Sequence, residues 1–187
     1  SEMCIRDSPL QHIIETITGQ SLRDFAKENI FDILGMQYTD YLPTIQQQDG
    51  KWINTVACPW MDRIAPTEKQ KDGSVLCGQV HDPLARILNG GISGNAGIFS
   101  NANDIGILAA ALLNGGEYNG HRILSPLGVK TMCTVPRELT AFGRTPGWDI
   151  FSPYASNKGD LFSPNTFGHT GYTCLLYTSP SPRDGLL

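Results

Sequence analysis

The chain of 187 residues is poor in charge, in basic residues and in long apolar runs. Only 17% of its residues are charged, and 14 Lys and Arg are scattered among 18 Asp and Glu. Phosphate binding needs clustered basic residues, so we expect no nucleic-acid partner. No apolar run approaches the ~20 residues of a membrane-spanning helix, so no transmembrane segment is expected. The 40% hydrophobic content is instead typical of a globular domain.

Cysteine is also scarce, with five residues in the chain. No C-x-x-C motif occurs, and no Cys and His have the spacing of zinc ligands. The sequence therefore gives no support to a disulfide scaffold or a zinc ribbon. We expect neither a metal nor another cofactor.

The two ends of the chain read like translated sequencing adapter. Residues 1–7, SEMCIRD, back-translate to TCG GAG ATG TGT ATA AGA GAC, a transposon end that is used to tag DNA libraries. Residues 174–184, CLLYTSPSPRD, back-translate to the reverse complement of the same element. Segments added to a protein in this way are excluded from fold reasoning. We therefore interpret residues 1–8 and 174–187 as adapter-derived and residues 9–173 as one partial domain.

Apolar periodicity in the first half predicts helices separated by an irregular segment. Residues 10–18 read as the end of a helix, with Gly19 after it. Ser21 is a candidate N-cap for an amphipathic helix that closes at Gly35. Its predicted apolar face comprises Leu22, Phe25, Ala26, Ile30, Ile33 and Leu34. Residues 36–78 show no sustained period and predict a long irregular excursion.

The second half predicts three more helices and two strands. Asp82 and Ser125 are candidate N-caps of short helices. Ser100 is the candidate cap of a helix that runs to Asn114, and its stretch from Ile107 to Leu113 is apolar on every side, which predicts burial. Aromatic and β-prone residues then favour strands near 147–151 and from about 167.

One of the four histidines has surroundings that favour function. His12 lies on a predicted helix and His121 follows a turn, so both are expected to be solvated or packed. His81 and Asp82 could form an acid/base pair, but a helix cap by Asp82 is the favoured interpretation. His169 lies in FGHTGY at 167–172, where glycines on either side let a ligand approach the backbone closely.

Three stretches of the chain resemble the β-lactamase-related serine hydrolase family. They are GQSLRDFAKENIFDILGM at 19–36, GQVHDPLARILNGGISGNAGIFSNANDIGILAAALLNGG at 78–116 and GWDIFSPYASNKGDLFSPNTFGHTGYT at 147–173. The family contains class C β-lactamases, penicillin-binding D-alanyl-D-alanine peptidases, D-amino-acid peptidases and small-ester hydrolases. The resemblance implies an α+β fold, of which this chain is a helix-rich fragment with part of an antiparallel sheet.

The same resemblance implies a context for the whole protein. The middle stretch looks most like a bacterial branch that is sometimes found behind a glycosidase domain, so a fused glycosidase is one expectation for the parent. Family habit implies a periplasmic or extracellular location. A small molecule or peptide is the implied substrate.

Family members use three motifs, of which this chain carries one. They are Ser-x-x-Lys, a Tyr-x-Asn, Tyr-x-Ser or Tyr-x-Asp, and a Lys-Thr-Gly or His-Thr-Gly on a strand beside the cleft. The resemblance implies that His169 faces substrate, that Thr170 and Gly171 shape the strand that binds substrate, and that the backbone N–H of Tyr172 stabilises the oxyanion. No Ser-x-x-Lys occurs in the chain.

The second motif has two formal matches, and a glycine-rich loop shows one departure. Tyr38-Thr39-Asp40 and Tyr154-Ala155-Ser156 match the tyrosine pattern, but neither stands just ahead of the helix at 10–18, where the family places it. Both matches are therefore interpreted as incidental. Asn95, in SGNAG, stands where relatives often have His, which leaves a contribution of that histidine to the cleft in doubt.

These observations leave two function classes open. The first is a parent serine hydrolase that acts through an acyl-serine intermediate on a D-amino-acid peptide, a β-lactam or a small ester. This chain lacks the nucleophile, so we expect it to be inactive itself. The second is a non-catalytic relative that binds cell-wall peptides or a partner protein on the same cleft, and Ser-x-x-Lys in the parent discriminates the two. A helical domain that only shares these patterns is a third interpretation.

Overall fold

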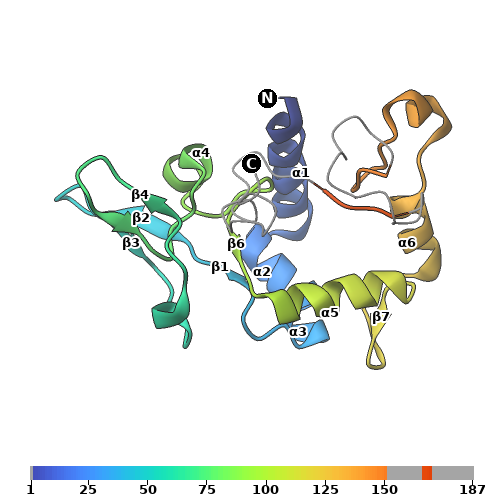
Figure 1. The fold of residues 1–187 in the computed structure, drawn as a ribbon, viewed down its shortest axis with the longest axis horizontal. Coiled ribbons are helices and arrows are strands. Elements are labelled where there is room, and N and C mark those ends of the chain that lie inside the picture. The colour runs from blue at the N-terminus through green and yellow to red at the C-terminus, as the bar shows by residue number, and fades with distance from the viewer. Residues whose placement is uncertain (1, 151–165, 170–187) are drawn as a thin grey trace, which may run out of the picture. The chain divides into compact units, whose positions relative to one another are not determined.

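The computed structural model describes the backbone of residues 2–150 and 166–169, and the side chains of residues 9–150 and 166–169. The chain divides into two compact units, which we treat separately. Unit 1 comprises residues 1–110 and 118–123, and unit 2 comprises residues 111–117 and 124–187 (Figure 1).

The first helices of unit 1 end where the sequence predicts. Helix α1 spans Glu2–Thr18 and is followed by Gly19, whose φ of 69° is the left-handed conformation that favours glycine after a helix. The next helical segment runs through α2 (Leu22–Ala26), a π-helical turn η1 (Lys27–Phe31) and α3 (Asp32–Leu34). Ser21 caps it as predicted, since its hydroxyl accepts a hydrogen bond from the Asp24 N–H at 3.1 Å.

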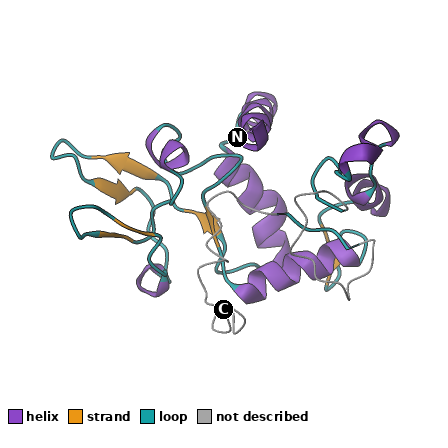
Figure 2. Cartoon of the chain, turned by 45° about the horizontal axis from the view of Figure 1, so that its top comes forward, coloured by secondary structure: helices purple, strands orange, loops and turns teal. Residues whose placement is uncertain are grey.

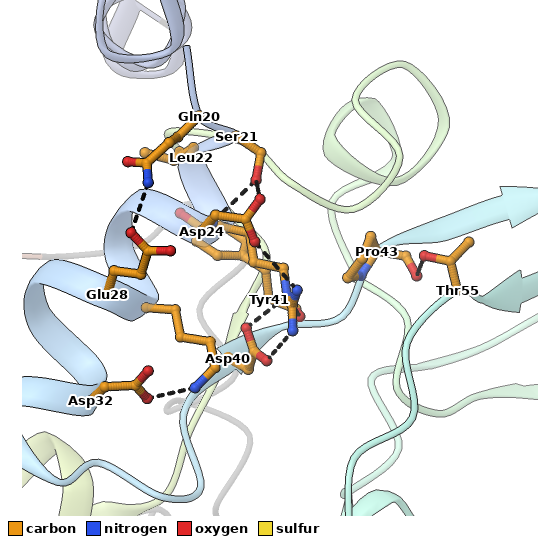
Figure 3. A network of polar contacts seen from close by, with 12 residues as sticks. Gln20, Ser21, Leu22, Asp24, Glu28, Asp32, Asp40, Tyr41, Pro43 and Thr55 are labelled. Atoms are coloured by element: carbon orange, nitrogen blue, oxygen red, sulfur yellow. Dashed lines mark hydrogen bonds and ion pairs between the residues drawn. The ribbon is translucent and has the colours of Figure 1, made fainter. Parts of the chain in front are cut away.

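The π-helical turn changes which side chains of this segment are buried. Leu22, Ala26 and Leu34 are buried as predicted, but Phe31 is buried at 4% exposure where Ile30 was expected. A π turn inserts one extra residue and rotates the buried face, which a regular helical period does not anticipate. Lys27 contacts Asp32 at 2.5 Å and Arg23 contacts Asp40 at 2.6 Å. Figure 3 shows the polar side of this segment, with Ser21 and Asp24 at its start and Asp32 and Asp40 further along the chain.

Residues 36–78 contain two β-hairpins rather than an irregular excursion, so that prediction was wrong. Strands β2 (Thr44–Gln46) and β3 (Trp52–Asn54) pair antiparallel, as do β4 (Glu68–Lys69) and β5 (Val75–Leu76). The two hairpins lie near one another in both views (Figures 1 and 2). A short 3₁₀ helix, η2 (Met61–Arg63), lies between them in sequence.

The remaining elements of unit 1 include a short pair of strands and helix α4. Strand β1 (Asp40–Tyr41) pairs antiparallel with β6 (Ile98–Phe99). Helix α4 (Pro83–Ile87) has the predicted cap, since Asp82 accepts hydrogen bonds from the N–H groups of residues 84 and 85. The buried apolar side chains of this unit are Leu22, Ala26, Phe31, Leu34, Met36, Tyr41, Leu42, Val80 and Ala85.

Helix α5 (Ala102–Leu113) spans the boundary between the units and differs from its prediction in two respects. Asn101 rather than Ser100 caps it, since the Asn101 Oδ1 accepts from the Asp104 N–H at 2.8 Å. The helix is not buried all round, because Ile105 is 50% exposed and Leu113 is 76% exposed. An apolar composition does not by itself specify which side of a helix is covered.

Beyond α5 the described chain forms a hairpin and two short helices. Strands β7 (Glu117–Tyr118) and β8 (His121–Arg122) are joined by a turn in which Asn119 and Gly120 have φ of 49° and 80°. Helix α6 (Pro126–Cys133) is capped by Ser125 as predicted. A 3₁₀ helix, η3 (Arg137–Phe142), was not predicted.

Candidate functional site

His169 follows Gly168, whose backbone N–H and carbonyl both form hydrogen bonds. In unit 2, Asp149 forms one antiparallel bridge with Arg144 and another with Gly168. The Asp149 N–H donates to the Gly168 carbonyl at 2.8 Å, and the Gly168 N–H donates back to the Asp149 carbonyl at 3.0 Å. His169, the next residue along, is exposed to solvent. Its backbone position is thus fixed while its side chain is accessible.

Asp149, the central residue of these bridges, is a buried carboxylate with a cationic partner. Its residue is 1% exposed, and its carboxylate forms an ion pair with Arg144, whose Nη2 lies 3.3 Å from Oδ2 and whose Nε contacts Oδ1. The turn between them is closed by Thr145, whose hydroxyl accepts from the Trp148 N–H at 2.8 Å. A buried carboxylate is tolerated only when it is paired, so this pair anchors the segment that precedes His169.

The strands predicted at 147–151 and from 167 are represented here by single bridges. The residues that the structure describes contain no extended ladder between the two segments. Thr170, Gly171 and Tyr172, which the resemblance assigns to substrate binding and the oxyanion, lie outside the described residues, as does Tyr154-Ala155-Ser156. Of the predicted site residues, the structure therefore places His169 alone.

In unit 1 the glycine-rich loop at residues 90–97 packs against the strand pair β1–β6. Gly97 has φ of 124°, and a Cβ there would lie 3.0 Å from the Tyr41 ring and collide with the Gly91 carbonyl. Gly91 also has positive φ, and a Cβ on it would lie 3.0 Å from the Leu42 carbonyl oxygen. Only glycine fits these two positions without a shift of backbone. The Tyr41 hydroxyl donates to the Ser93 carbonyl at 3.3 Å, and burial raises the pKa of Tyr41 to about 12.

Polar side chains inside this loop fix the orientation of Asn95. Ser93 is fully buried, and its hydroxyl accepts from the Asn89 amide at 2.9 Å and donates to the Asn95 Oδ1 at 2.6 Å. Gln11, on α1, holds the same loop from outside, because its amide donates to the Ile92 carbonyl at 3.2 Å and accepts from the Gly94 N–H at 3.0 Å. The loop is thus built as a rigid element. Sequence reasoning noted Asn95 but missed Gln11, because the contact joins residues 81 or more positions apart.

The other sequence candidates have structural roles. Asp82 caps α4, and the Nδ1 of His81 lies 2.9 Å from the Thr67 carbonyl, which confirms the structural interpretation of that pair. The Tyr38 backbone donates to Asp104, and Asp40 is bound by Arg23. His12 and His121 are both exposed, on α1 and β8.

The described residues offer neither a candidate metal cluster nor a candidate membrane-spanning helix. No group of three or more His, Cys, Asp and Glu side chains is placed to hold a metal ion there. Within the same residues, no helix combines the length and the apolar character that crossing a bilayer requires.

Comparison with known proteins identifies the family. The family model described as beta-lactamase matches residues 8–181, which is most of the chain. The chain therefore belongs to the β-lactamase family, and the α+β combination of helices with short antiparallel strands is the architecture expected of a fragment of that fold.

Two curated relatives share one description. A protein of Escherichia coli strain K12, named "Putative D-alanyl-D-alanine carboxypeptidase", is 35% identical over 178 residues, which cover 88% of this chain and 38% of the relative. A protein of the same name from Salmonella agona is 33% identical, with 92% of this chain and 40% of the relative covered. The chain thus spans about two fifths of the length of these relatives. Their name mentions no glycosidase, so a fused glycosidase domain stays a prediction.

Among solved structures, two penicillin-binding proteins align with the chain. The octameric penicillin-binding protein homologue from Pyrococcus abyssi is 19% identical, with a TM-score of 0.42, and the match covers 78% of this chain and 29% of that one. The penicillin-binding protein from Bacillus halodurans is 16% identical, with a TM-score of 0.35, and covers 67% and 31%.

Proposed function

We propose that the protein to which this chain belongs is a serine hydrolase that cleaves a peptide ending in D-alanyl-D-alanine. The observation that carries the proposal is the family match over residues 8–181, which includes the His-Thr-Gly at 169–171. The name shared by the relatives above supports a D-alanyl-D-alanine peptide over a β-lactam or a small ester as the substrate.

The chemistry proceeds through an acyl-serine. A serine hydroxyl, supplied by a Ser-x-x-Lys outside this chain, attacks the peptide carbonyl while a neighbouring base takes its proton. The oxyanion that forms accepts hydrogen bonds from two backbone N–H groups, one on the serine and one on Tyr172. The terminal D-alanine leaves as a protonated amine, and water then hydrolyses the acyl-serine to regenerate the hydroxyl and release the shortened peptide.

The residues of this chain bind and orient substrate. We assign His169 the position that faces the substrate, as a hydrogen-bond donor or cation, and assign Thr170 and Gly171 the strand against which the peptide lies. The exposure of His169 beside the anchored Gly168 supports this assignment. Because no Ser-x-x-Lys occurs in it, the 187-residue chain itself is inactive.

A fluorescent penicillin tests the inactivity of this chain. The purified chain should show no covalent label after denaturing electrophoresis, because it has no serine in the required motif. A labelled band for the 187-residue chain would overturn the assignment of the nucleophile to another part of the protein.

The parental gene tests the hydrolase proposal and the nature of the chain ends. We propose that residues 1–8 and 174–187 are adapter-derived, so amplification from unfragmented DNA should replace both segments. The frame upstream of Pro9 should supply Ser-x-x-Lys and a tyrosine motif, and the expressed parent should be labelled. A parental frame without that serine would leave a non-catalytic peptide-binding relative as the function. Recurrence of SEMCIRD in genomic DNA would refute the adapter origin.

A further inference from the structure

The polar network of the loop at residues 90–97 ends on a side chain that reaches solvent. The Asn89 amide donates to the Ser93 hydroxyl at 2.9 Å, and that buried hydroxyl donates to the Asn95 Oδ1 at 2.6 Å. Asn95 is itself partly exposed. Because its oxygen accepts from Ser93, its Nδ2 carries two N–H donors for other groups, and no partner for them lies among the described residues.

Contacts with α1 fix the position of this donor before a ligand binds. Gln11 donates to the Ile92 carbonyl and accepts from the Gly94 N–H. The Gln11 amide also donates to the Glu15 carboxylate at 3.1 Å, which restricts its own rotation. The residues directly before Asn95 are therefore held on α1, and a preordered donor binds an acceptor without the cost of ordering the loop.

The chemistry of the residue at position 95 favours a donor that is used. Aspartate would accept from the Ser93 hydroxyl as asparagine does, so an acceptor alone does not require Asn95. Members of the family that the chain resembles often have His here, and a neutral imidazole accepts at one ring nitrogen and donates at the other. Asparagine and histidine thus share an acceptor for Ser93 together with a donor, and aspartate lacks the donor.

The loop lies against the helix that follows the family's tyrosine motif. The resemblance implies that this motif stands just ahead of residues 10–18, and Gln11 is in the first turn of that stretch. Two helical turns measure about 11 Å along the axis, so the loop and the motif are separated by a distance on that order. Three extended residues of a bound peptide cover about 10 Å. A peptide that is cleaved beside the motif therefore reaches Asn95 with the residues ahead of its D-alanyl-D-alanine end.

We propose that Asn95 is a substrate-binding residue, which donates a hydrogen bond from Nδ2 to a backbone carbonyl of the bound peptide. This assignment rests on the proposed function, in which the substrate is a peptide that ends in D-alanyl-D-alanine. Residues 90–97 contain no Lys or Arg. Carboxylates are typically bound by Arg or Lys, so a neutral amide donor in this loop matches the neutral carbonyl of a peptide group.

Two substrates of different length separate binding by Asn95 from a general defect. The expressed parent is assayed with acetyl-D-alanyl-D-alanine and with a pentapeptide that ends in D-alanyl-D-alanine, by the release of D-alanine. Asn95→Asp retains the acceptor for Ser93 and removes the donor. One hydrogen bond is worth a factor of about 2 to 12, so kcat/KM should fall about threefold or more further for the pentapeptide than for the dipeptide. The loss should lie mainly in KM, because the contact is made in the ground state and in the transition state alike.

Two further variants serve as rescue and control. Asn95→His restores both the acceptor and the donor, and it should recover most of the loss. Asn29→Asp makes the same change of charge at an exposed position of η1 and should alter kcat/KM for neither substrate. Circular dichroism confirms that each variant is folded. Equal losses for the two substrates, or no loss in Asn95→Asp, would overturn the assignment of Asn95.

This outcome is separable from that of the proposed function. A parent without penicillin labelling removes the hydrolase, and fluorescence anisotropy of a dye-labelled pentapeptide then measures the same contact, with weaker binding expected in Asn95→Asp and not in Asn95→His. A labelled parent in which Asn95→Asp treats both peptides alike leaves the hydrolase standing and removes the role of Asn95. A parent that neither cleaves nor binds the pentapeptide overturns both.

Discussion

Tyr41 should make unit 1 unstable in alkali. The phenol is buried, with its residue 4% exposed, and burial raises its pKa to about 12 from the ordinary value of 10. In the unfolded chain the phenol ionises near pH 10, whereas in the folded chain it stays neutral until about pH 12. The unfolded state therefore binds fewer protons between these values, and stability falls as the pH rises through this window.

The size of the effect follows from the shift. Two pKa units at about 1.4 kcal/mol each correspond to a loss of about 3 kcal/mol between pH 10 and pH 12, with the full stabilisation present below pH 10. That is a large fraction of the 5–15 kcal/mol or so that stabilises a typical domain. The loss should first release the loop at residues 90–97, because the Tyr41 hydroxyl donates to the Ser93 carbonyl.

Urea unfolding at several pH values measures this loss. The Tyr41→Phe variant removes the ionising group and retains the ring against Gly97, so the difference in unfolding free energy between the two proteins isolates Tyr41 from the five other tyrosines. The difference should be constant below pH 10 and shrink above it. Parallel loss of stability in both proteins from pH 10 to 12 would refute the reasoning.

Three substitutions test the packing of the two candidate segments and one helix cap. Asp149→Ala should cost about 1.5–3 kcal/mol in urea unfolding followed by tryptophan fluorescence, because it removes the buried carboxylate that pairs with Arg144, whereas Asp49→Ala, on the surface, should cost less than about 1 kcal/mol. Gly97→Ala should lower the melting temperature, since its Cβ would meet the Gly91 carbonyl; an unchanged melting temperature would contradict this. Asp82→Ala should cost about 1 kcal/mol through the lost cap of α4, and no loss would mean that the cap is not formed.

The elements that sequence reasoning predicted are those with a local signal. Ser21, Asp82 and Ser125 each satisfy backbone donors two or three residues ahead, and these caps lie in a few residues of sequence. The two hairpins also had a local signal, because Asp49-Gly50 and Asp72-Gly73 lie in their loops. Asp-Gly between β-prone residues is a strong hairpin signal, which the prediction of an irregular excursion over residues 36–78 did not use.

The features that sequence reasoning missed follow no repeating pattern in the sequence. The π turn at residues 27–31 places Phe31 in the core, where the helical period had predicted Ile30. A single residue inserted into a helix leaves no mark in the spacing of apolar residues. His169 was proposed as a site residue from its glycine neighbours. Its anchor was not, because the Arg144–Asp149 pair and the bridge to Gly168 join residues five and nineteen positions apart in no repeating pattern.

The hydrogen bonds between Gln11 and the loop at residues 90–97 join segments that are distant in sequence, and they can be tested directly. Gln11→Ala removes the two hydrogen bonds that its amide makes to residues 92 and 94, each worth about 0.5–1.5 kcal/mol net. Because Gly94 is exposed, water replaces part of the loss, so global stability should fall by less than the sum while the loop opens more often. Amide hydrogen exchange of residues 91–97 should accelerate by about fivefold or more, and that of α3 should not change. Gln20→Ala, which removes an exposed hydrogen bond to Glu28, should leave the loop unaffected. Unchanged exchange at residues 91–97 in Gln11→Ala would mean that the glycine backbone and Tyr41 alone hold the loop.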